Sequence, residues 1–394
     1  HPQDWDDYFT HQSDGTRIGD MPRVANIALF VAVVCAAWSC TIGVFSGSCT
    51  VDGRPMLWKN RDVPNALQQY IYVEAEHSFV GITYQGVYDK VYGGANDAGF
   101  AIVNTDTYNH GHWTGAGLSD GEVMFIALSR CETVWDFMHL LDSLLSDTSA
   151  GLRSTHCYGV IDADGNAVII EASCSDYVYC SALSAPSGFL IRTNFAVSGD
   201  DSDRRGMDRY LRARDFLEPI VPLSYIDVLS AARDLVTVEL DPNPLPFEGT
   251  FDGLPFGYIS TENTINRYYT TSYQIIIGKH SGDNPVYPVM WSGFGLPYGS
   301  IPVPIWVSSS SVPPQMTGTS APMCDDAIFI KGRIHDQTNI TYFNTYAAHR
   351  AREFLEPVEE DVIHWYESRM DMWQKSGTSM DTLSQFQQLS LIHI

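Results

Sequence analysis

A short apolar run near the start of the chain, residues 27–37, limits how the rest can be organised. It is shorter than the ~20 apolar residues that a membrane-spanning helix needs. A methionine and an arginine lie just before it, and Ala37-Trp38-Ser39 closes it directly before Cys40. A basic start, an apolar centre and small residues before a cut are typical of a secretory signal. We therefore expect residues 21–39 to be a signal peptide, residues 1–20 to be a non-native upstream segment, and an exported chain to begin at Cys40.

The start of the chain allows an alternative to the signal peptide, and its last residues are excluded from the predicted domain. In a bacterial lipoprotein Cys40 would carry lipid, although Trp38 stands where the lipidation signal prefers a small residue. Residues 389–394 follow a polar stretch and match no packing pattern, so we treat them as an artefactual tail. Between these ends we find no repeat and no second domain. A single domain is therefore expected over residues 40–388.

The composition describes an acidic globular protein. Its 23 Lys and Arg against 47 Asp and Glu give a net charge of −24 at pH 7. Nucleic acids and anionic lipid surfaces attract basic faces, so this balance argues against both as partners. The hydrophobic content of 44%, with 12% aromatic residues, excludes wholesale disorder. A small molecule is the expected partner, no stable membrane insertion is expected, and association of identical copies stays open.

Hydrophobic spacing divides the chain into strands and helices. Strands are predicted in residues 40–48, 55–62, 70–91, 99–104, 158–171, 189–195 and 268–277. Hairpin turns are predicted at Asp52-Gly53 and Asp164-Gly165. Helices are predicted in residues 122–145, 209–217, 225–235 and 346–373, the last interrupted near Pro357. Residues 280–325 are rich in Pro, Gly and Ser and are expected to form a loop-rich cover. The pattern predicts stacked sheets covered by helices.

A cysteine at the start of a mature chain combines a nucleophile and a base on one residue. The thiolate is the attacking form of the side chain. A free α-amine, with a reference pKa of ~7.7 to 8.0, can accept the thiol proton near neutrality. Cys40 can therefore carry nucleophilic catalysis without a histidine, provided that its amine is free.

Several segments around Cys40 resemble a known enzyme family. Cys40-Thr41, Asp52-Gly53-Arg54-Pro55 and Lys59-Asn60-Arg61-Asp62 resemble the opening of N-terminal-nucleophile (Ntn) hydrolases. The most similar branch is the penicillin acyltransferase and choloylglycine hydrolase group. Residues 94–104, 190–194 and 207–213 resemble further elements of that group, and the resemblance thins beyond residue 275. It implies an α+β fold, a four-layer αββα sandwich of two antiparallel sheets flanked by helices, and cleavage of linear amides.

The resemblance also implies catalytic roles. It makes Cys40 the nucleophile and places Asp62 against the α-amine. Asn104 would donate to the oxyanion, an interaction whose loss costs roughly 10²–10³ in rate. Asn194 would lie at the active site, and Arg209, at the start of a helix, would lie near the nucleophile.

One position departs from the family pattern. Lys59 stands where the family has an arginine, which keeps the positive charge but not the planar guanidinium. Arg61 would compensate, and we assign Arg61 and Asn60 to substrate binding. The predicted function is an exported amidohydrolase or acyltransferase. A related cysteine dipeptidase, or a non-catalytic lipoprotein with lipid on Cys40, is the alternative.

Other motifs are discounted. His110-Gly111-His112 offers two metal ligands at most and is taken as a surface loop, so no metal and no organic cofactor are expected. Asn339-Ile340-Thr341 is a glycosylation sequon, meaningful only in a eukaryotic secretory route. Disulfides are permitted in an exported chain, and Cys174 and Cys180 are close enough in sequence to close a hairpin, but no pairing is assigned.

Overall fold

The computed structural model describes residues 39–392, except for 112–113, 147–150, 237–242, 246–247, 252, 281, 284–287 and 337. The described residues fall in one compact unit. The predicted upstream segment and the signal peptide up to residue 38 lie outside the described residues, as does His112.

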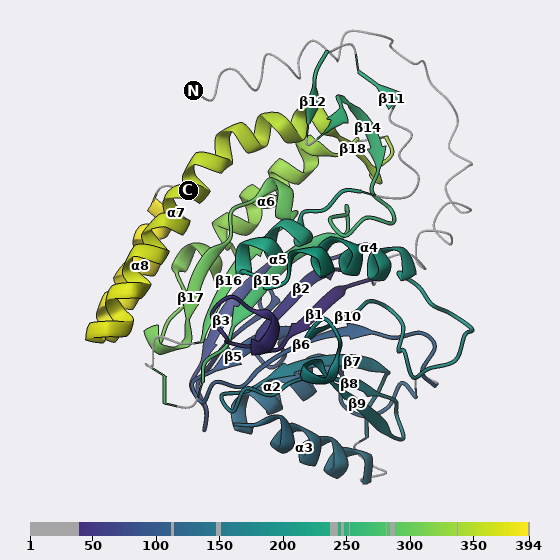
Figure 1. Ribbon diagram of the computed structural model, residues 1–394, viewed down its shortest axis with the longest axis vertical. Coiled ribbons are helices and arrows are strands. Elements are labelled where there is room, and N and C mark those ends of the chain that lie inside the picture. Colours follow the sequence, from purple (N-terminus) through teal and green to yellow (C-terminus); the bar gives the residue numbers. More distant parts are fainter. Residues whose placement is uncertain are drawn as a thin grey trace. The chain divides into compact units, whose positions relative to one another are not determined.

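The first sheet has six antiparallel strands in the order β10-β1-β2-β15-β16-β17 (Figure 1). They are β1 (Thr41–Phe45), β2 (Met56–Asp62), β10 (Phe189–Arg192), β15 (Thr270–Ile277), β16 (Val289–Phe294) and β17 (Val303–Trp306). The predicted hairpin between β1 and β2 is confirmed. Its turn needs glycine because Gly53 has a φ of 75°, and the Asp52 side chain accepts from the Arg54 N–H at 3.0 Å.

The second sheet has seven antiparallel strands in chain order. They are β3 (Gln68–Val73), β4 (Phe79–Tyr84), β5 (Gly93–Asn96), β6 (Ala101–Asp106), β7 (His156–Ile161), β8 (Ala167–Ala172) and β9 (Tyr177–Ser181). The hairpin predicted at Asp164-Gly165 is confirmed as the connection between β7 and β8. Because sequential strands pair throughout, local patterns were sufficient to predict most of this sheet.

Helices pack against both sheets. They are α2 (Asp120–Arg130), α3 (Val134–Ser146), α4 (Met207–Leu217), α5 (Tyr225–Ala232), α6 (Pro322–Ile334), α7 (Thr345–Ser376) and α8 (Met380–Ile392). Short strands β11 (Asn243–Pro244), β12 (Thr250–Phe251), β13 (Leu254–Pro255), β14 (Gly257–Ser260) and β18 (Tyr342–Asn344) form two small sheets. Helices α2 and α3 lie against the second sheet, and α4 and α5 lie on the far side of the first (Figure 1).

The buried side chains form three apolar layers. One lies between the two sheets and includes Ile42 and Val103. A second packs the first sheet against helices and includes Trp58 and Leu217. A third packs the second sheet against α2 and α3 and includes Phe137. Helix, sheet, sheet and helix therefore follow one another, and the expected αββα sandwich is confirmed.

Three local expectations were wrong. The helix expected over residues 122–145 is broken into α2 and α3, because Asp136 accepts from the N–H of Thr133 at 2.8 Å and caps a new helix. Pro357 does not interrupt α7, whose later turns pack Tyr366 and Trp373 against the core. The expected cover over residues 280–325 contains two buried strands, and Pro304 is tolerated in β17 because that strand is at the sheet edge.

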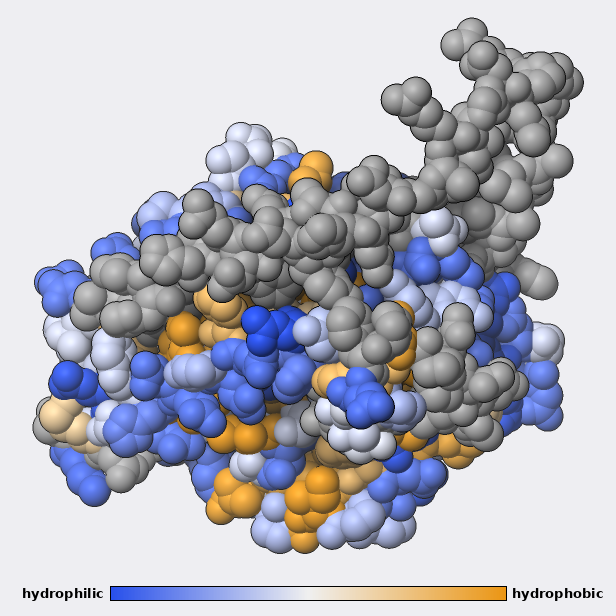
Figure 2. Space-filling view, turned by 90° about the horizontal axis from the view of Figure 1, so that it is seen from above, coloured by the Kyte–Doolittle hydropathy of each residue, from blue (hydrophilic) through white to orange (hydrophobic). Residues whose placement is uncertain are grey.

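The surface of the described part is mixed. On the face seen in Figure 2, hydrophilic side chains are interspersed with smaller apolar areas. Among the described helices, none combines the length and apolar composition needed to cross a bilayer.

Candidate active site

Cys40 lies at the entrance to the central hairpin of the first sheet. It precedes β1 directly, and its side chain is partly buried. The preceding residue is held against the neighbouring strand, because the Ser39 N–H donates to the Asp62 carbonyl at 3.4 Å. The bond between Ser39 and Cys40, where the sequence predicts a cut, therefore lies beside Asp62.

Arg209 binds the backbone around Cys40 from the first turn of α4. Its Nη1 donates to the Cys40 carbonyl at 2.9 Å and to Thr41 Oγ1 at 2.8 Å. Glycine is required just before the helix, because Gly206 has a φ of 80° and a Cβ there would overlap Arg209 Nη2. Arg209 is 2% exposed, so burial lowers its pKa to about 10, and it stays charged at neutral pH. The arginine thus fixes the position of the Cys40 backbone.

Asn194 connects Arg209 with the second sheet. Its Oδ1 accepts from Arg209 Nη2 at 2.7 Å. Its Nδ2 donates at 3.2 Å to Thr105 Oγ1 and at 3.2 Å to the Asp106 carbonyl. Thr105 Oγ1 in turn donates to the Cys40 carbonyl at 3.4 Å. The predicted Asn194 and Arg209 are therefore brought together beside Cys40.

Lys59 and Asn104 meet between the two sheets. Lys59 Nζ, on β2, donates to Asn104 Oδ1, on β6, at 2.6 Å and to the Tyr92 carbonyl at 2.7 Å. Asn104 Nδ2 donates to Asp120 Oδ2 at 2.8 Å. An amide nitrogen carries two hydrogens, so the second N–H of Asn104 can face an oxyanion.

Burial and the neighbouring charges have opposing effects on the pKa of the Cys40 thiol. Burial raises the pKa of Cys40, and the positive charge of Lys59 lowers it, while Asp62 and Asp106 raise it. Burial lowers the pKa of Lys59 to about 8, against the opposing effect of Cys40. In the uncut chain the nitrogen of Cys40 is an amide and cannot accept the thiol proton. The thiol is therefore held protonated until a base becomes available.

Asp62 is a buried carboxyl with an acceptor oxygen to spare. It is 0% exposed, and its Oδ1 accepts from Thr270 Oγ1 at 2.8 Å. Its Oδ2 makes no hydrogen bond and lies 3.9 Å from Arg267 Nε. Burial raises the pKa of Asp62 to about 6, although Arg267 and Arg209 pull it down. A cationic donor placed at this oxygen, such as a free α-ammonium group, would give it the hydrogen-bond partner that it lacks.

The two residues assigned to substrate binding are occupied elsewhere. Asn60 is fully buried on the other face of β2, where its Nδ2 donates to the Ala232 carbonyl at 2.9 Å and its Oδ1 accepts from Trp58 Nε1 at 2.9 Å. Arg61 is 2% exposed, lies 4.4 and 4.2 Å from the ring centres of Tyr84 and Tyr92, and donates to the Gln68 side chain. The structure does not bring Asn60 to the site, and it gives Arg61 structural contacts.

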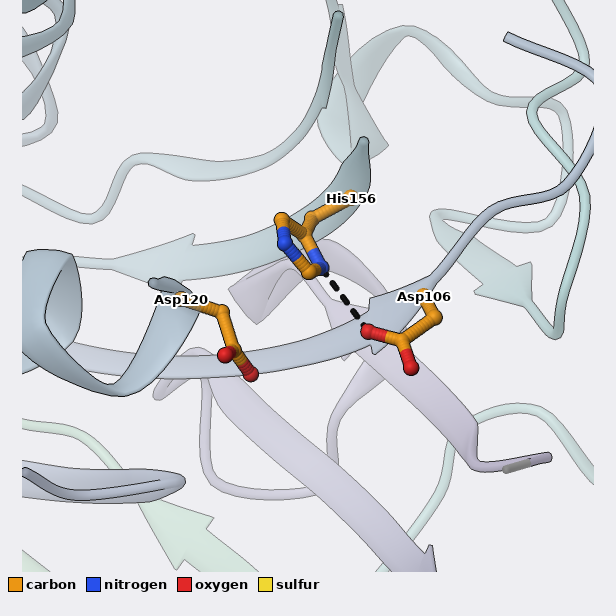
Figure 3. Close-up of side chains that lie close together, drawn as sticks. All are labelled: Asp106, Asp120 and His156. Carbon is orange, nitrogen blue, oxygen red and sulfur yellow. Dashed lines mark ion pairs between the residues drawn. The ribbon is translucent and has the colours of Figure 1, made fainter. Parts of the chain in front are cut away.

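Sequence reasoning missed three further residues next to the site. Asp106, Asp120 and His156 converge (Figure 3), and Asp120 accepts a hydrogen bond from Asn104. Strand alternation was a usable signal for Asp106, which is two residues after Asn104 on β6 and shares its face. Asp120 and His156 come from separate segments, and no local spacing connects them.

The cysteines of the described chain are free thiols. Cys180 is exposed and Cys174 is partly buried, and they are not joined to one another. The hairpin disulfide that the sequence left open is therefore not formed.

Comparison with known families supports the resemblance found in the sequence. Residues 49–208 match the family model described as acyl-coenzyme A:6-aminopenicillanic acid acyl-transferase. The matched segment contains Lys59, Asp62, Asn104 and Asn194, whereas Cys40 and Arg209 lie outside it. No curated protein matches the sequence. The resemblance to the penicillin acyltransferase group of Ntn hydrolases is thus confirmed. The assignment of Cys40 and Arg209 to the site rests on their geometry in the structure, because the family match does not include them.

The solved structures that match this chain are distant from it in sequence. Penicillin V acylase from Agrobacterium tumefaciens is 14% identical with a TM-score of 0.43, and the match covers 68% of this chain and 86% of that one. A Caenorhabditis elegans ortholog of N-acylethanolamine-hydrolyzing acid amidase is 14% identical with a TM-score of 0.40, covering 60% and 92%. A variant of conjugated bile acid hydrolase from Clostridium perfringens is 10% identical with a TM-score of 0.35, covering 64% and 89%.

Proposed function

We propose that this chain is an exported amidohydrolase or acyltransferase that cleaves a linear amide C–N bond through a thioester on Cys40. One observation carries the proposal. Polar side chains from β2, β6, α4 and the segment after β10 converge on Cys40, although they are far apart in the sequence. A cysteine that only packed in the core would need no buried lysine or arginine beside it, because burying such charges is costly.

Activation begins with removal of the segment before Cys40, which frees its α-amine. The amine accepts the thiol proton, and the resulting ammonium is held by the unpaired Oδ2 of Asp62. Lys59 stabilises the thiolate, since an opposite charge lowers a thiol pKa. The predicted signal peptide and export belong to this proposal, because a secretory cut is the step that would release the amine.

The chemical step then follows from the groups around the sulfur. The Cys40 thiolate attacks the amide carbonyl carbon, a C–S bond forms, and the electron pair moves onto oxygen. The second N–H of Asn104 donates to this oxyanion. When the carbonyl reforms, the C–N bond breaks, and the leaving amine takes the proton held by the α-ammonium. Water, or an acceptor amine, then attacks the thioester carbonyl and gives a proton to the α-amine. The C–S bond breaks, its electron pair returns to sulfur, and the acyl group is released.

Positioning comes from groups that do not react. Arg209 holds the Cys40 carbonyl and the Asn194 amide, and this fixes the backbone that carries both nucleophile and base. Correct placement of reacting groups is worth several kcal/mol in enzymes.

Hydrolysis is favoured over acyl transfer because water is always present outside the cell.

A panel of acyl amides, including penicillin V, conjugated bile salts, N-acyl homoserine lactones and dipeptides, tests the function. The chain cut before Cys40 should release amine from at least one of them and carry the acyl mass on Cys40. Cys40→Ala should abolish turnover with the fold retained, whereas Cys180→Ala, at an exposed thiol, should not change it. Turnover by Cys40→Ala, or a lipid on Cys40, would overturn the proposal.

A further inference from the structure

A second polar cluster lies beside the thiol site, and the proposed thioester chemistry assigns no step to it. Asp106 ends β6, and His156, its directly paired residue, begins β7. Asp120 is the first residue of α2. One ligand atom from each residue lies within 4.8 Å of the other two, and the three side chains point toward one another (Figure 3).

The imidazole of His156 provides an independent observation that points to a ligand at this cluster. The side chain is 3% exposed, and its Nδ1 lies 2.9 Å from Asp106 Oδ1. Yet this nitrogen makes no hydrogen bond of acceptable geometry. The two atoms form an ion pair when the imidazole is protonated, and they can share a bound cation when it is neutral. Ligand atoms that share one tetrahedral zinc ion, at ~2.0–2.2 Å each, are separated by about 3.3–3.6 Å.

The surroundings of the cluster resemble the outer shell of a metal site. The other ring nitrogen, His156 Nε2, lies 2.8 Å from Ser154 Oγ, which can orient the ring. Asp120 Oδ2 accepts from Asn104 Nδ2 at 2.8 Å, which orients that carboxylate. Both carboxylates are only partly buried, so solvent ions can reach them.

The donor set selects a class of ion. One neutral imidazole and two carboxylates carry two negative charges, which a divalent cation balances. Calcium and magnesium prefer oxygen ligands and larger coordination numbers, whereas imidazole with carboxylates suits zinc and its neighbours. Three protein ligands leave one tetrahedral position for water.

We propose that Asp106, Asp120 and His156 bind a divalent transition-metal cation of the zinc type. This proposal departs from the prediction that the chain binds no metal, which could not take account of three ligands contributed by separate segments. The site is coupled to the thiol. The charge of Asp106 raises the pKa of Cys40, so a bound dication would offset negative charge next to the nucleophile. Asn104 also connects Asp120 with Lys59 through hydrogen bonds to both.

Titration calorimetry with zinc chloride tests the site on the full chain. The measurement uses a Cys40→Ala background, so that the reactive thiol cannot be counted as a ligand. One zinc ion should bind per chain. Asp120→Asn and His156→Gln should each weaken binding at least ~10-fold, since loss even of outer-shell partners costs 10–100-fold in affinity. His139→Gln and Asp142→Asn, two exposed side chains on α3, are matched controls and should bind as the background does.

Circular dichroism without metal verifies that each variant is folded, and Asp120→Asn provides the test should the buried His156 variant unfold. Cobalt substitution gives a second measurement. Its d–d spectrum should appear in the background protein without a thiolate charge-transfer band and disappear in Asp120→Asn. Absence of saturable binding, or equal binding by Asp120→Asn and the background, would overturn the proposal and leave a proton as the cation of the cluster.

Discussion

Replacing Lys59 by methionine should make the Cys40 thiol a weaker acid without removing the side-chain volume. Lys59 is 2% exposed, and its charge opposes the rise that burial imposes on the thiol pKa. A nearby opposite charge shifts a pKa by about 1–3 units. The thiol pKa should therefore rise by about 1–3 units in Lys59→Met, and the thiolate fraction below that pKa should fall by about 10- to 10³-fold.

The assay is the rate of alkylation of Cys40 as a function of pH, followed by the mass of the peptide that contains it. Exposed Cys180 gives an internal reference in the same digest. Lys59→Arg keeps the charge and should retain most of the reactivity. Lys331→Met is the matched control, because Lys331 is also buried and its pKa is also lowered to about 8 by burial, but it is not among the charges that shift Cys40.

A Lys59→Met profile that coincides with the wild-type profile would refute the assigned role of this charge. So would an equal shift in Lys331→Met, since the effect would then follow from loss of any buried lysine.

Three further outcomes follow from the site. Activity should be bell-shaped in pH. It should fall below about pH 6 as Asp62, whose pKa is raised by burial, becomes protonated, and above about pH 8 as Lys59 loses its charge. Lys59→Arg should move only the basic limb, to higher pH, and a basic limb that does not move in this variant would contradict the assignment to Lys59. Arg209→Met should lower kcat at least ~10²-fold, because the Cys40 carbonyl and the Asn194 amide lose their common donor, and circular dichroism distinguishes this from unfolding. Asn60→Ala should lower the free energy of unfolding by about 2–4 kcal/mol in urea titration while kcat per folded molecule is kept; a selective rise in KM would restore its predicted substrate role.

Much of the fold could be predicted from local patterns. Turn residues such as Asp52-Gly53 fix hairpins within a few positions, and amphipathic spacing identifies the helices that cover the sheets. The prediction failed where long-range packing decides. Strands β16 and β17 are short and interrupted by glycine and proline, and they are recognisable only once β15 offers an edge to pair with.

The site was predictable to a different degree at each residue. Cys40, Lys59 and Asp62 belong to one hairpin, so their proximity follows from strand pairing. Asn104, Asn194 and Arg209 lie in other elements, and only the family resemblance connected them with Cys40. Alternation along β2 could have corrected Asn60, since neighbours on a strand point to opposite faces of the sheet.

The residues that were missed share one property. Asp106, Asp120 and His156 are ordinary acidic and imidazole side chains at the ends of a strand, a helix and another strand. Nothing in their sequence spacing brings them together, because the pairing of β6 with β7 and the docking of α2 do so. Clusters of this kind need the tertiary structure to be recognised.

The central claim is that one residue provides both sulfur and amine, and the N-terminal peptide of the active, purified protein tests it most directly. We predict a peptide that begins at Cys40, has an unmodified α-amine, and gains the mass of the acyl group when turnover is stopped by acid. Full activity from a chain that still carries Ser39, or an acylated or lipidated amine on Cys40, would contradict it.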